Sequence, residues 1–313
     1  MLRFDFTDIN DNTLTLSSPV YIVINQDENI PADDLSVVFP FKKDTPELCK
    51  VSVYDGERLV FKGVVDEQQS IINSDKRYTK ITARSMAAML LDNESRPVSY
   101  TNISTSVIFE RHLKPNGIEG YSGDDKVLKE SLNIMKGTTD WQAFYSFAIK
   151  AYNKIPRIKS DGTADFSGVR SDDILKFSDK NGIKYSSVKE NNKRCKLISD
   201  VFVKAGMNSG YNVGVSEPKV KNRKINRRRY LDVSAQKDFD TADLMLKNGV
   251  KNSYEVTIKT PLRIIDRLGA EAEIENAYLG TLKGLYVSSI YYKLTPDKEE
   301  TTLIIKENKN VDS

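Results

Sequence analysis

The chain has one histidine and two cysteines among 313 residues, and these shortages exclude several kinds of site. One histidine cannot build a metal site that needs two imidazoles, and it leaves a single imidazole for acid–base chemistry. Cys49 and Cys195 lie far apart and form no CxxC pair, which argues against a disulfide framework or a zinc knuckle. We therefore expect two buried free thiols and no metal or other cofactor.

Long apolar runs are also missing. The best run, residues 87–91, is far shorter than the roughly 20 residues that span a bilayer. Acidic residues interrupt the N-terminal stretch MLRFDFTDIN, where a secretory signal would be continuously apolar. The sequence predicts a soluble protein that has no membrane partner and is assembled in the cytoplasm.

Patterns typical of catalysis are scarce. No residue near His112 has the context of a nucleophile, so we expect a structural or exposed histidine. The order GxxSG at 206–210 differs from the GxSxG of a nucleophile elbow, which favours a helix end and a loop. No glycine motif that would cradle a phosphate is present. The sequence therefore predicts a protein that is not an enzyme.

Acidic residues show no catalytic or metal-binding spacing either. The loop SDGTADFSG carries Asp161 and Asp165, but its glycine is not at the sixth position that an EF-hand loop requires, so we assign it to turn chemistry. Glycoside hydrolysis needs a couple of carboxylates. The acidic pairs fall in unrelated contexts, at 33–34, 124–125 and 172–173.

Charge is nearly balanced, with 47 Lys and Arg against 44 Asp and Glu, so the whole chain is not a polyanion-binding protein. One basic segment stands out, and its members are Lys219, Lys221, Arg223, Lys224, Arg227, Arg228 and Arg229. It is either a solvated loop or a grip for an acidic partner or for the phosphates of a passing nucleic acid. The scarcity of aromatic residues before Tyr230 argues against base stacking.

The first 97 residues have the pattern of strands joined by turns, with strands expected at 20–24, 35–39, 49–54, from 59 and at 78–83. Asp55-Gly56 predicts a hairpin with a type I′ turn. Gly63 interrupts the strand that follows, where a glycine is typical of a bulge or a sharp bend at a barrel corner. A helix over 86–91, capped by Ser85 and ended by Asp92-Asn93, is expected to close this segment.

Helical spacing dominates residues 98–212. The stretch TTDWQAFYSFAIKAY predicts a helix that begins with a capping box formed by Thr139 and Gln142. A second helix is expected in NNKRCKLISDVFVKAG, with its apolar face at 197–205 and a stop at Gly206. A shorter helix in STSVIFERHLKPNG should end at Pro115.

Strand patterns return after residue 212. SYEVTIK alternates apolar and polar residues, and a short helix before it is expected to be capped by Asp240 and closed by Gly249. Residues 59–83 and 279–306 share one layout, in which Lys-Gly precedes a long strand and Asp-Lys marks the next turn. The glycines of this echo are Gly63 and Gly284. Either the chain contains two related β-barrels, or two hairpins coincide by chance.

These stretches resemble the baseplate hub proteins of contractile phage tails and of phage-tail-like bacteriocins. The resemblance rests on their order and spacing, in VYDGERLVFKGVVDE, YTKITARSMAAMLLDNE, TTDWQAFYSFAIK, NNKRCKLISDVFVKAG and GLYVSSIYYKLTPDKEETTLIIK. It covers most of the chain, although none of these motifs is catalytic. It implies an α+β, mainly β fold, with barrel domains at 1–97 and 213–313 around a helix-rich domain at 98–212.

The resemblance also implies a function. Three chains would present six barrels at the centre of a baseplate and so join a hexameric tail tube to a trimeric spike. The expected partners are two further copies of the chain, the tube and spike proteins, and baseplate wedge or tape-measure proteins. The expected location is the baseplate of a virion or of a tail-like bacteriocin, and nucleic acid would only pass through.

Two alternatives remain. A tail-associated peptidoglycan hydrolase would need catalytic residues for which the sequence shows no pattern. A nucleic-acid-binding module centred on 219–229 would show steeply salt-dependent affinity.

Overall fold

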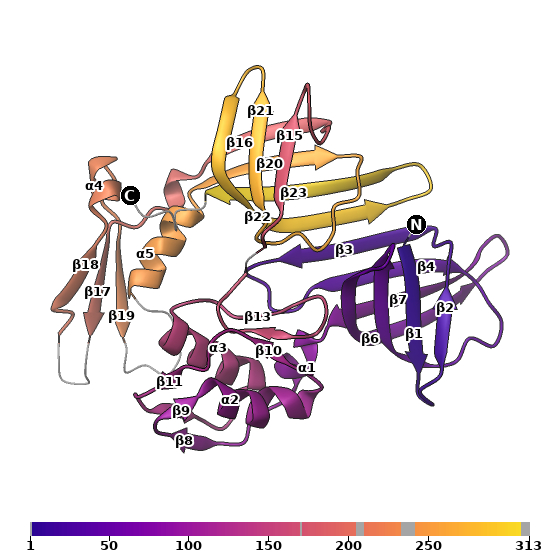
Figure 1. Cartoon of the computed structure of the whole chain (residues 1–313), viewed down its shortest axis with the longest axis horizontal. Helices are drawn as coiled ribbons and strands as arrows, with labels where there is room; N and C mark the ends of the chain where they lie inside the picture. The colour runs from indigo at the N-terminus through magenta and orange to yellow at the C-terminus, as the bar shows by residue number, and fades with distance from the viewer. Residues whose placement is uncertain (1, 170, 205–209, 233–241, 308–313) are drawn as a thin grey trace. The chain divides into compact units, whose positions relative to one another are not determined.

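The structure is a computed structural model, and it describes residues 2–169, 171–204, 210–232 and 242–307. Contacts between Cα atoms divide the chain into two compact units. Unit 1 comprises Met1–Asp173, Lys259–Ala270 and Ser288–Leu303, and unit 2 comprises Ile174–Ile258, Glu271–Val287 and Ile304–Ser313. Strands predominate over helices in both units (Figure 1), which confirms a mainly β fold. The three-domain division at 97/98 and 212/213 stays a prediction.

One antiparallel sheet forms the β-rich part of unit 1. Its strands are β1 (Leu2–Asp8), β2 (Thr13–Leu16), β3 (Tyr21–Asp27), β4 (Asp34–Pro40), β5 (Leu48–Asp55), β6 (Arg58–Ile72), β7 (Arg77–Ser85), the last part of β22 (Gly280–Leu294) and the start of β23 (Glu299–Glu307). The order of these strands is β23-β22-β3-β4-β7-β6-β5-β1-β2. No hydrogen-bonded ring closes this path within the described residues, so the closed barrels expected from the sequence are not found.

The core of this sheet follows the alternation of its strands. In β1, Phe4 and Phe6 are fully buried while their neighbours reach the surface. Phe39 of β4 meets both rings edge-on, with ring centroids 5.4 and 6.1 Å away. A fully buried phenylalanine contributes about 1.5–3 kcal/mol through the hydrophobic effect, so this ring cluster stabilises the sheet directly.

The rest of unit 1 combines helices with short strands. The helices are α1 (Ala87–Asp92), α2 (Thr105–Ile108), a π-helical turn (Phe109–Leu113), a 3-10 turn (Lys114–Asn116) and α3 (Asp140–Tyr152). The strands are β8 (Val98–Tyr100), β9 (Ile103–Ser104), β10 (Tyr121–Ser122), β11 (Val127–Leu128), β12 (Leu132–Ile134), β13 (Arg157–Ile158) and β14 (Ala164–Asp165). The capping box predicted for Thr139 and Gln142 begins α3. Phe144 and Phe147 of α3 pack edge-on against Phe166.

Unit 2 contains two groups of strands. The first includes β15 (Ile174–Ser178), β16 (Ser187–Asn192), β20 (Tyr254–Thr260), β21 (Glu271–Asn276), the start of β22 and the end of β23 (Glu299–Glu307). The second is a three-stranded sheet of β17 (Asp200–Lys204), β18 (Val213–Ser216) and β19 (Arg228–Asp232), with β17 in the middle. The helices are a 3-10 turn (Arg194–Lys196), α4 (Pro218–Asn222) and α5 (Ala242–Lys251). The strand predicted from SYEVTIK is confirmed as β20.

The helix predicted over 197–205 is wrong. Residues 194–196 form a 3-10 turn, and β17 begins at Asp200. Val201, Phe202 and Val203 favour strands, and β17 has a hydrogen-bonded neighbour on each side. Val201 is buried against α5, so tertiary packing outweighs the helical spacing. The predicted stop at Gly206 lies outside the described residues.

Two predicted helix ends are also wrong. Ser85 does not cap α1, because its hydroxyl accepts a hydrogen bond from the backbone N–H of Asp33 instead. Gly249 does not end α5, which continues to Lys251. A Cβ at Gly249 would lie 3.0 Å from the carbonyl oxygen of Lys196, so this glycine allows a close approach of two backbones. The predicted cap at Asp240 lies outside the described residues.

The cysteines are free, but the prediction that both are buried is wrong. Cys49 is half-buried, and its Sγ lies 3.3 Å from the carbonyl oxygens of Thr7 and Asp8. Cys195 is exposed. Within the described residues, no helix combines the length and apolarity needed to cross a membrane.

Gly63 lies where β6 is paired on both sides, opposite Val51 of β5 and Ser85 of β7. A Cβ placed on Gly63 would lie only 2.1 Å from the carbonyl oxygen of Arg84. Such a contact is far inside van der Waals distance, and the obstructing atom belongs to the backbone. The glycine is therefore required by close packing of neighbouring strands.

We expect Gly63→Ala to lower the free energy of unfolding by about 3 kcal/mol or more, because the new methyl group must push β7 away. Gly56→Ala is the control, since φ is +63° there and nothing lies within 4 Å of its Cβ position. This control should cost about 1–2 kcal/mol from backbone conformation alone. Urea denaturation would measure both, and equal losses would contradict the steric explanation.

Candidate functional site

The only histidine is buried in a polar cluster in unit 1. Nδ1 of His112 lies 3.1 Å from the Ser95 hydroxyl and 2.9 Å from Oδ1 of Asp140. Nε2 lies 3.0 Å from the hydroxyl of Tyr100. A catalytic triad needs serine and carboxylate on opposite ring nitrogens, whereas here both lie at Nδ1. Ser95 and His112 are each 3% exposed, so the cluster is structural, as expected for His112.

The same cluster keeps a carboxylate ionised inside the fold. Burial alone would raise the pKa of Asp140, but hydrogen bonds from His112, Ser95 and Asn116 hold it below its usual value. The cluster thus joins α3 to the turn at 109–116.

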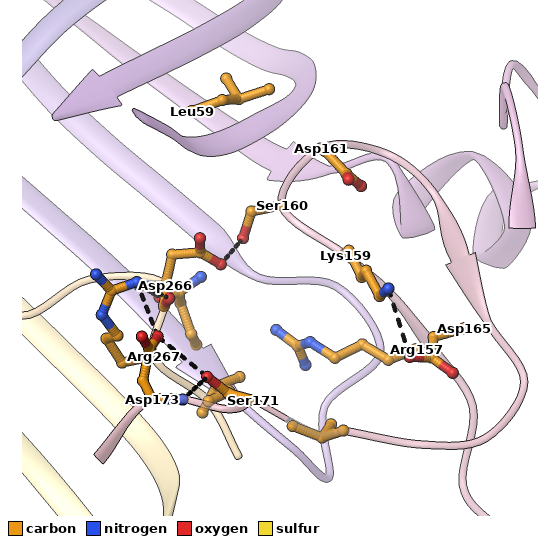
Figure 2. Close-up of a pocket in the computed structure, with 13 residues that line it drawn as sticks. Leu59, Arg157, Lys159, Ser160, Asp161, Asp165, Ser171, Asp173, Asp266 and Arg267 are labelled. Carbon is orange, nitrogen blue, oxygen red and sulfur yellow. Dashed lines mark hydrogen bonds and ion pairs between the residues drawn. The ribbon is translucent and has the colours of Figure 1, made fainter. Parts of the chain in front are cut away.

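A polar pocket of about 290 Å³ lies elsewhere in unit 1 (Figure 2). Charged and hydroxyl side chains line much of it, and they come from two stretches of sequence, 157–173 and 266–267. The lining residues are Gln26, Leu59, Arg157, Lys159, Ser160, Asp161, Asp165, Val169, Ser171, Asp173, Asp266, Arg267 and Leu268.

Arg157 extends across this pocket (Figure 2), and its guanidinium forms a buried ion pair with Asp33. Its Nη2 lies 2.6 and 2.7 Å from the two carboxylate oxygens of Asp33, and its Nη1 donates to the carbonyl of Asp27. Burial raises the pKa of Asp33, while the Arg157 charge and a hydrogen bond from Gln26 act against that rise. Removing either partner would leave the other charge buried without compensation.

Asp266 is a second buried carboxylate on the pocket wall. Its φ is +57°, a left-handed conformation that Asp tolerates. Its N–H donates to Gln26 at 2.7 Å, and its Oδ1 accepts from the hydroxyl of Ser160 at 2.5 Å. Burial raises the pKa of Asp266 to about 6, although the Ser160 hydrogen bond and the Arg58 charge act in the opposite direction.

Four other charges of the pocket form two ion pairs. Lys159 lies 3.7 Å from Asp165, and Arg267 lies 3.2 Å from Asp173. In the part of the chain that the structure describes, no three histidine, cysteine or acidic side chains are placed to hold a metal ion. The polar side chains of the pocket therefore bind one another and connect separate segments of the chain.

The sequence did not predict these contacts between segments. The acidic pairs at 33–34 and 172–173 were placed in unrelated contexts, yet Asp33 holds Arg157 and Asp173 lines the same pocket. The turn chemistry expected for the SDGTADFSG loop is confirmed. The carboxylates of Asp161 and Asp165 each accept the N–H two residues later.

The residues of the basic segment have different environments. Lys221 lies 2.6 Å from Asp200 and, with Ser216, lowers the pKa of Asp200 to about 2. Arg227 donates to three backbone carbonyls around the 194–196 turn, at 2.6 to 3.2 Å. The other five are exposed, namely Lys219, Arg223, Lys224, Arg228 and Arg229. Lys221 and Arg227 thus support the local fold.

The residues predicted to form turns and bends have different backbone geometries. Asp55 and Arg58 close the β5–β6 hairpin, so its two central residues are Gly56 and Glu57. Only Gly56 has a positive φ, whereas a type I′ turn needs a positive φ at both central residues, so the predicted type I′ geometry is wrong. Gly284 has a φ of +68° and lies at a register shift between β21 and β22, which is the geometry of a β-bulge. Gly63 and Gly284 therefore do not share one geometry.

We expect Arg157→Met to lower the free energy of unfolding by about 3–5 kcal/mol, because Asp33 would remain buried and unpaired. Lys114→Met is the matched control, since its partner Glu110 and Lys114 itself are more than half exposed. That control should change stability by less than about 1 kcal/mol. Adding Asp33→Leu to Arg157→Met should restore part of the loss in urea denaturation. No recovery would contradict the ion-pair explanation.

Asp266 predicts a pH dependence of stability. Its pKa of about 6 in the folded state exceeds the usual 3.8, so the folded state binds the proton more tightly. The stabilisation is complete below pH about 4 and is lost as the pH rises through 6, by up to about 3 kcal/mol. Asp266→Asn should remove this change from unfolding curves measured between pH 4 and 7. Ser160→Ala should shift the change to higher pH, and an unaltered profile in both variants would exclude Asp266 as its source.

Comparisons with known proteins agree on the fold. No protein-family model matches the sequence, and no curated protein matches it. Among solved structures, a tail protein from Neisseria meningitidis MC58 is 15% identical, with a TM-score of 0.75 over 98% of this chain and 96% of that one. The 43 kDa tail protein of prophage MuSo2 from Shewanella oneidensis is 12% identical, with a TM-score of 0.76 over the full length of both chains.

A third similar structure comes from a Gram-positive host. The prophage tail protein gp18 from Listeria monocytogenes EGD-e is 10% identical, with a TM-score of 0.61 over 98% of this chain and 95% of that one. At such low identities the likeness concerns the fold, and it extends over nearly the whole chain. The resemblance expected from the sequence is thereby confirmed at the level of the fold: the chain is built like phage tail proteins.

Proposed function

We propose that the chain is the structural hub of a contractile-tail baseplate, in which three copies present six related β-rich domains. These domains match a hexameric tail tube on one side, and the threefold symmetry of the hub matches a trimeric spike on the other. Residues 1–97 and 213–313 would supply the two related domains, and residues 98–212 would form the part between them. The fold shared with prophage tail proteins supports this proposal.

A repeated hairpin is the observation that carries it. β6 and β22 are each 15 residues long, and the strands that follow, β7 and β23, are each nine residues long. Four residues join each pair, 73–76 and 295–298. Two hairpins of this unusual length and matching layout supply what an adapter needs, namely two like elements in one chain.

The two connecting turns also share their hydrogen bonds. In the first, the N–H of Asn73 donates to the carbonyl of Lys76, and the side-chain oxygen of Asn73 accepts from the N–H of Lys76. In the second, Thr295 and Lys298 make the same two bonds. The agreement favours a repeated unit over coincidence, because different residue types reproduce one turn.

The site chemistry supports a structural role over a peptidoglycan hydrolase. His112 is buried with serine and carboxylate on one ring nitrogen, and the pocket charges are held by neighbouring residues. A hydrolase would instead need an accessible acid and base within reach of a glycosidic or amide bond.

We expect three copies of the chain at one end of each tail particle from cells that carry the gene. Because the chain mass is 35.4 kDa, a trimer released from the particles should have a mass three times as large, about 106 kDa, by light scattering. Gold labelling of a tagged chain should mark only the baseplate end of the tube. Labels along the tube, a different stoichiometry, or digestion of cell walls by the purified chain would overturn the proposal.

A further inference from the structure

One face of the three-stranded sheet of unit 2 carries no helix among the described residues of that unit (Figure 1). α5 packs on the other face, where Leu246 meets Val201 and Leu231. Since side chains alternate along strands, Phe202 and Tyr230 point away from α5. They are paired in register across β17 and β19, and their rings are stacked with centroids 5.7 Å apart.

The face without a helix carries a cluster of three rings, Phe202, Tyr211 and Tyr230. Tyr211 meets Tyr230 edge-on at 5.2 Å. Tyr230 is 61% exposed and Tyr211 is 41% exposed. Gly214 of β18 lies opposite Phe202, and a Cβ there would come within 3.2 Å of its ring, so the glycine leaves room for the cluster.

The cluster corrects one step of the sequence interpretation. The basic segment contains no aromatic residue before Tyr230, but the fold places Phe202 and Tyr211 beside Tyr230 from strands and loops distant in sequence. Exposed rings are unfavourable in water, and a group of them next to basic residues is typical of interaction sites.

The neighbouring cations are available for a partner. Among the described residues, no carboxylate lies within ion-pair distance of the five exposed members of the basic segment, Lys219, Arg223, Lys224, Arg228 and Arg229. Lys221 is already held by Asp200, and Arg227 by backbone carbonyls. Charge complementarity therefore calls for an acidic partner.

The composition of the face favours protein over nucleic acid. Tyr and Arg dominate the energetic centres of protein–protein interfaces. An acidic protein segment can place its carboxylates at the outer cations and its apolar side chains on the rings.

We propose that the face of β18-β17-β19 with the ring cluster and Arg228, together with the exposed cations of the adjoining α4 segment, binds an acidic segment of another protein of the tail particle. This inference rests on the proposed hub function and names a contact that the hub uses. The rings would contribute the buried apolar area, and Arg228, which lies on the same face as Tyr230, would orient the partner.

Intact tail particles provide the test. Hydroxyl-radical footprinting should show Tyr211 and Tyr230 at least about fivefold less oxidised in particles than in the isolated chain. A carbodiimide, which joins lysine amines to nearby carboxylates, should link Lys219 or Lys224 to an Asp or Glu of another tail protein. Tyr278, which is 96% exposed and lies outside this sheet, is the internal reference for oxidation.

Variants add a second readout. Tyr230→Ser with Arg228→Ser and Lys219→Ser should lower incorporation of the chain into particles about tenfold or more, as loss of an interface centre does. Tyr278→Ser with Lys42→Ser and Lys43→Ser removes one exposed ring and two exposed charges elsewhere, and it should assemble normally. Retained trimer mass of the first variant would show that it still folds.

The remaining outcomes separate this proposal from the hub function. Particles that contain three copies of the chain but leave both tyrosines fully oxidisable would overturn the docking face alone. Protection that nuclease treatment removes would also overturn it, in favour of nucleic acid. Particles that lack the chain would overturn the hub function and this proposal together.

Discussion

A buried ion pair between Asp33 and Arg157 joins parts of unit 1 that are 124 residues apart in the sequence. Withdrawing two charges from water costs several kcal/mol per ion, and their attraction in the interior only offsets that cost. We infer that the pair matters for specificity more than for net stability, because only one placement of the loop satisfies both charges. Gln26 extends the constraint by bonding to the Asp33 carboxylate and to the N–H of Asp266. The segment that starts at Arg157 is thus held by the ion pair to Asp33, directly before β4, and a few residues later by the Ser160 hydroxyl to Asp266.

The hairpins β6–β7 and β22–β23 agree in some features and differ in others. Strand lengths and turn hydrogen bonds agree between β6–β7 and β22–β23, because these set where a long strand reverses. The glycines do not agree. Gly63 lies where three strands pack closely, and Gly284 turns the backbone through a bulge at a positive φ. The two hairpins therefore have the same length but different backbone geometries at their glycines. The Lys-Gly match in the sequence did not indicate this difference.

The sequence predicted correctly those helices, strands and turns that are determined by residues close to one another in the chain. The capping box of α3, the strands expected at 20–24, 35–39, 49–54, from 59 and at 78–83, and the hairpin at Asp55-Gly56 were predicted from neighbouring residues, whereas β1 and β2 were not. Prediction failed where distant contacts decide the conformation. Residues 200–204 have helical spacing, but pairing with β18 and β19 makes them a strand, and Ser85 bonds to Asp33 instead of capping α1. The pocket was missed for the same reason, since Asp33, Arg157 and Asp266 carry no common motif and meet only in the folded chain.

In the proposed ring of three chains, the two hairpins of each chain would together present six like elements to a sixfold partner. The sheet β18-β17-β19 lies outside both hairpins, so it would occur three times in such a ring. It carries the exposed rings and Arg228, and the adjoining Lys219, Arg223 and Lys224 have no acidic partner among the described residues. Lys221 binds Asp200 of that sheet, and Arg227 binds the backbone of its flanking turn. The basic segment therefore contains two residues that stabilise the local fold and five exposed residues that could contact a partner.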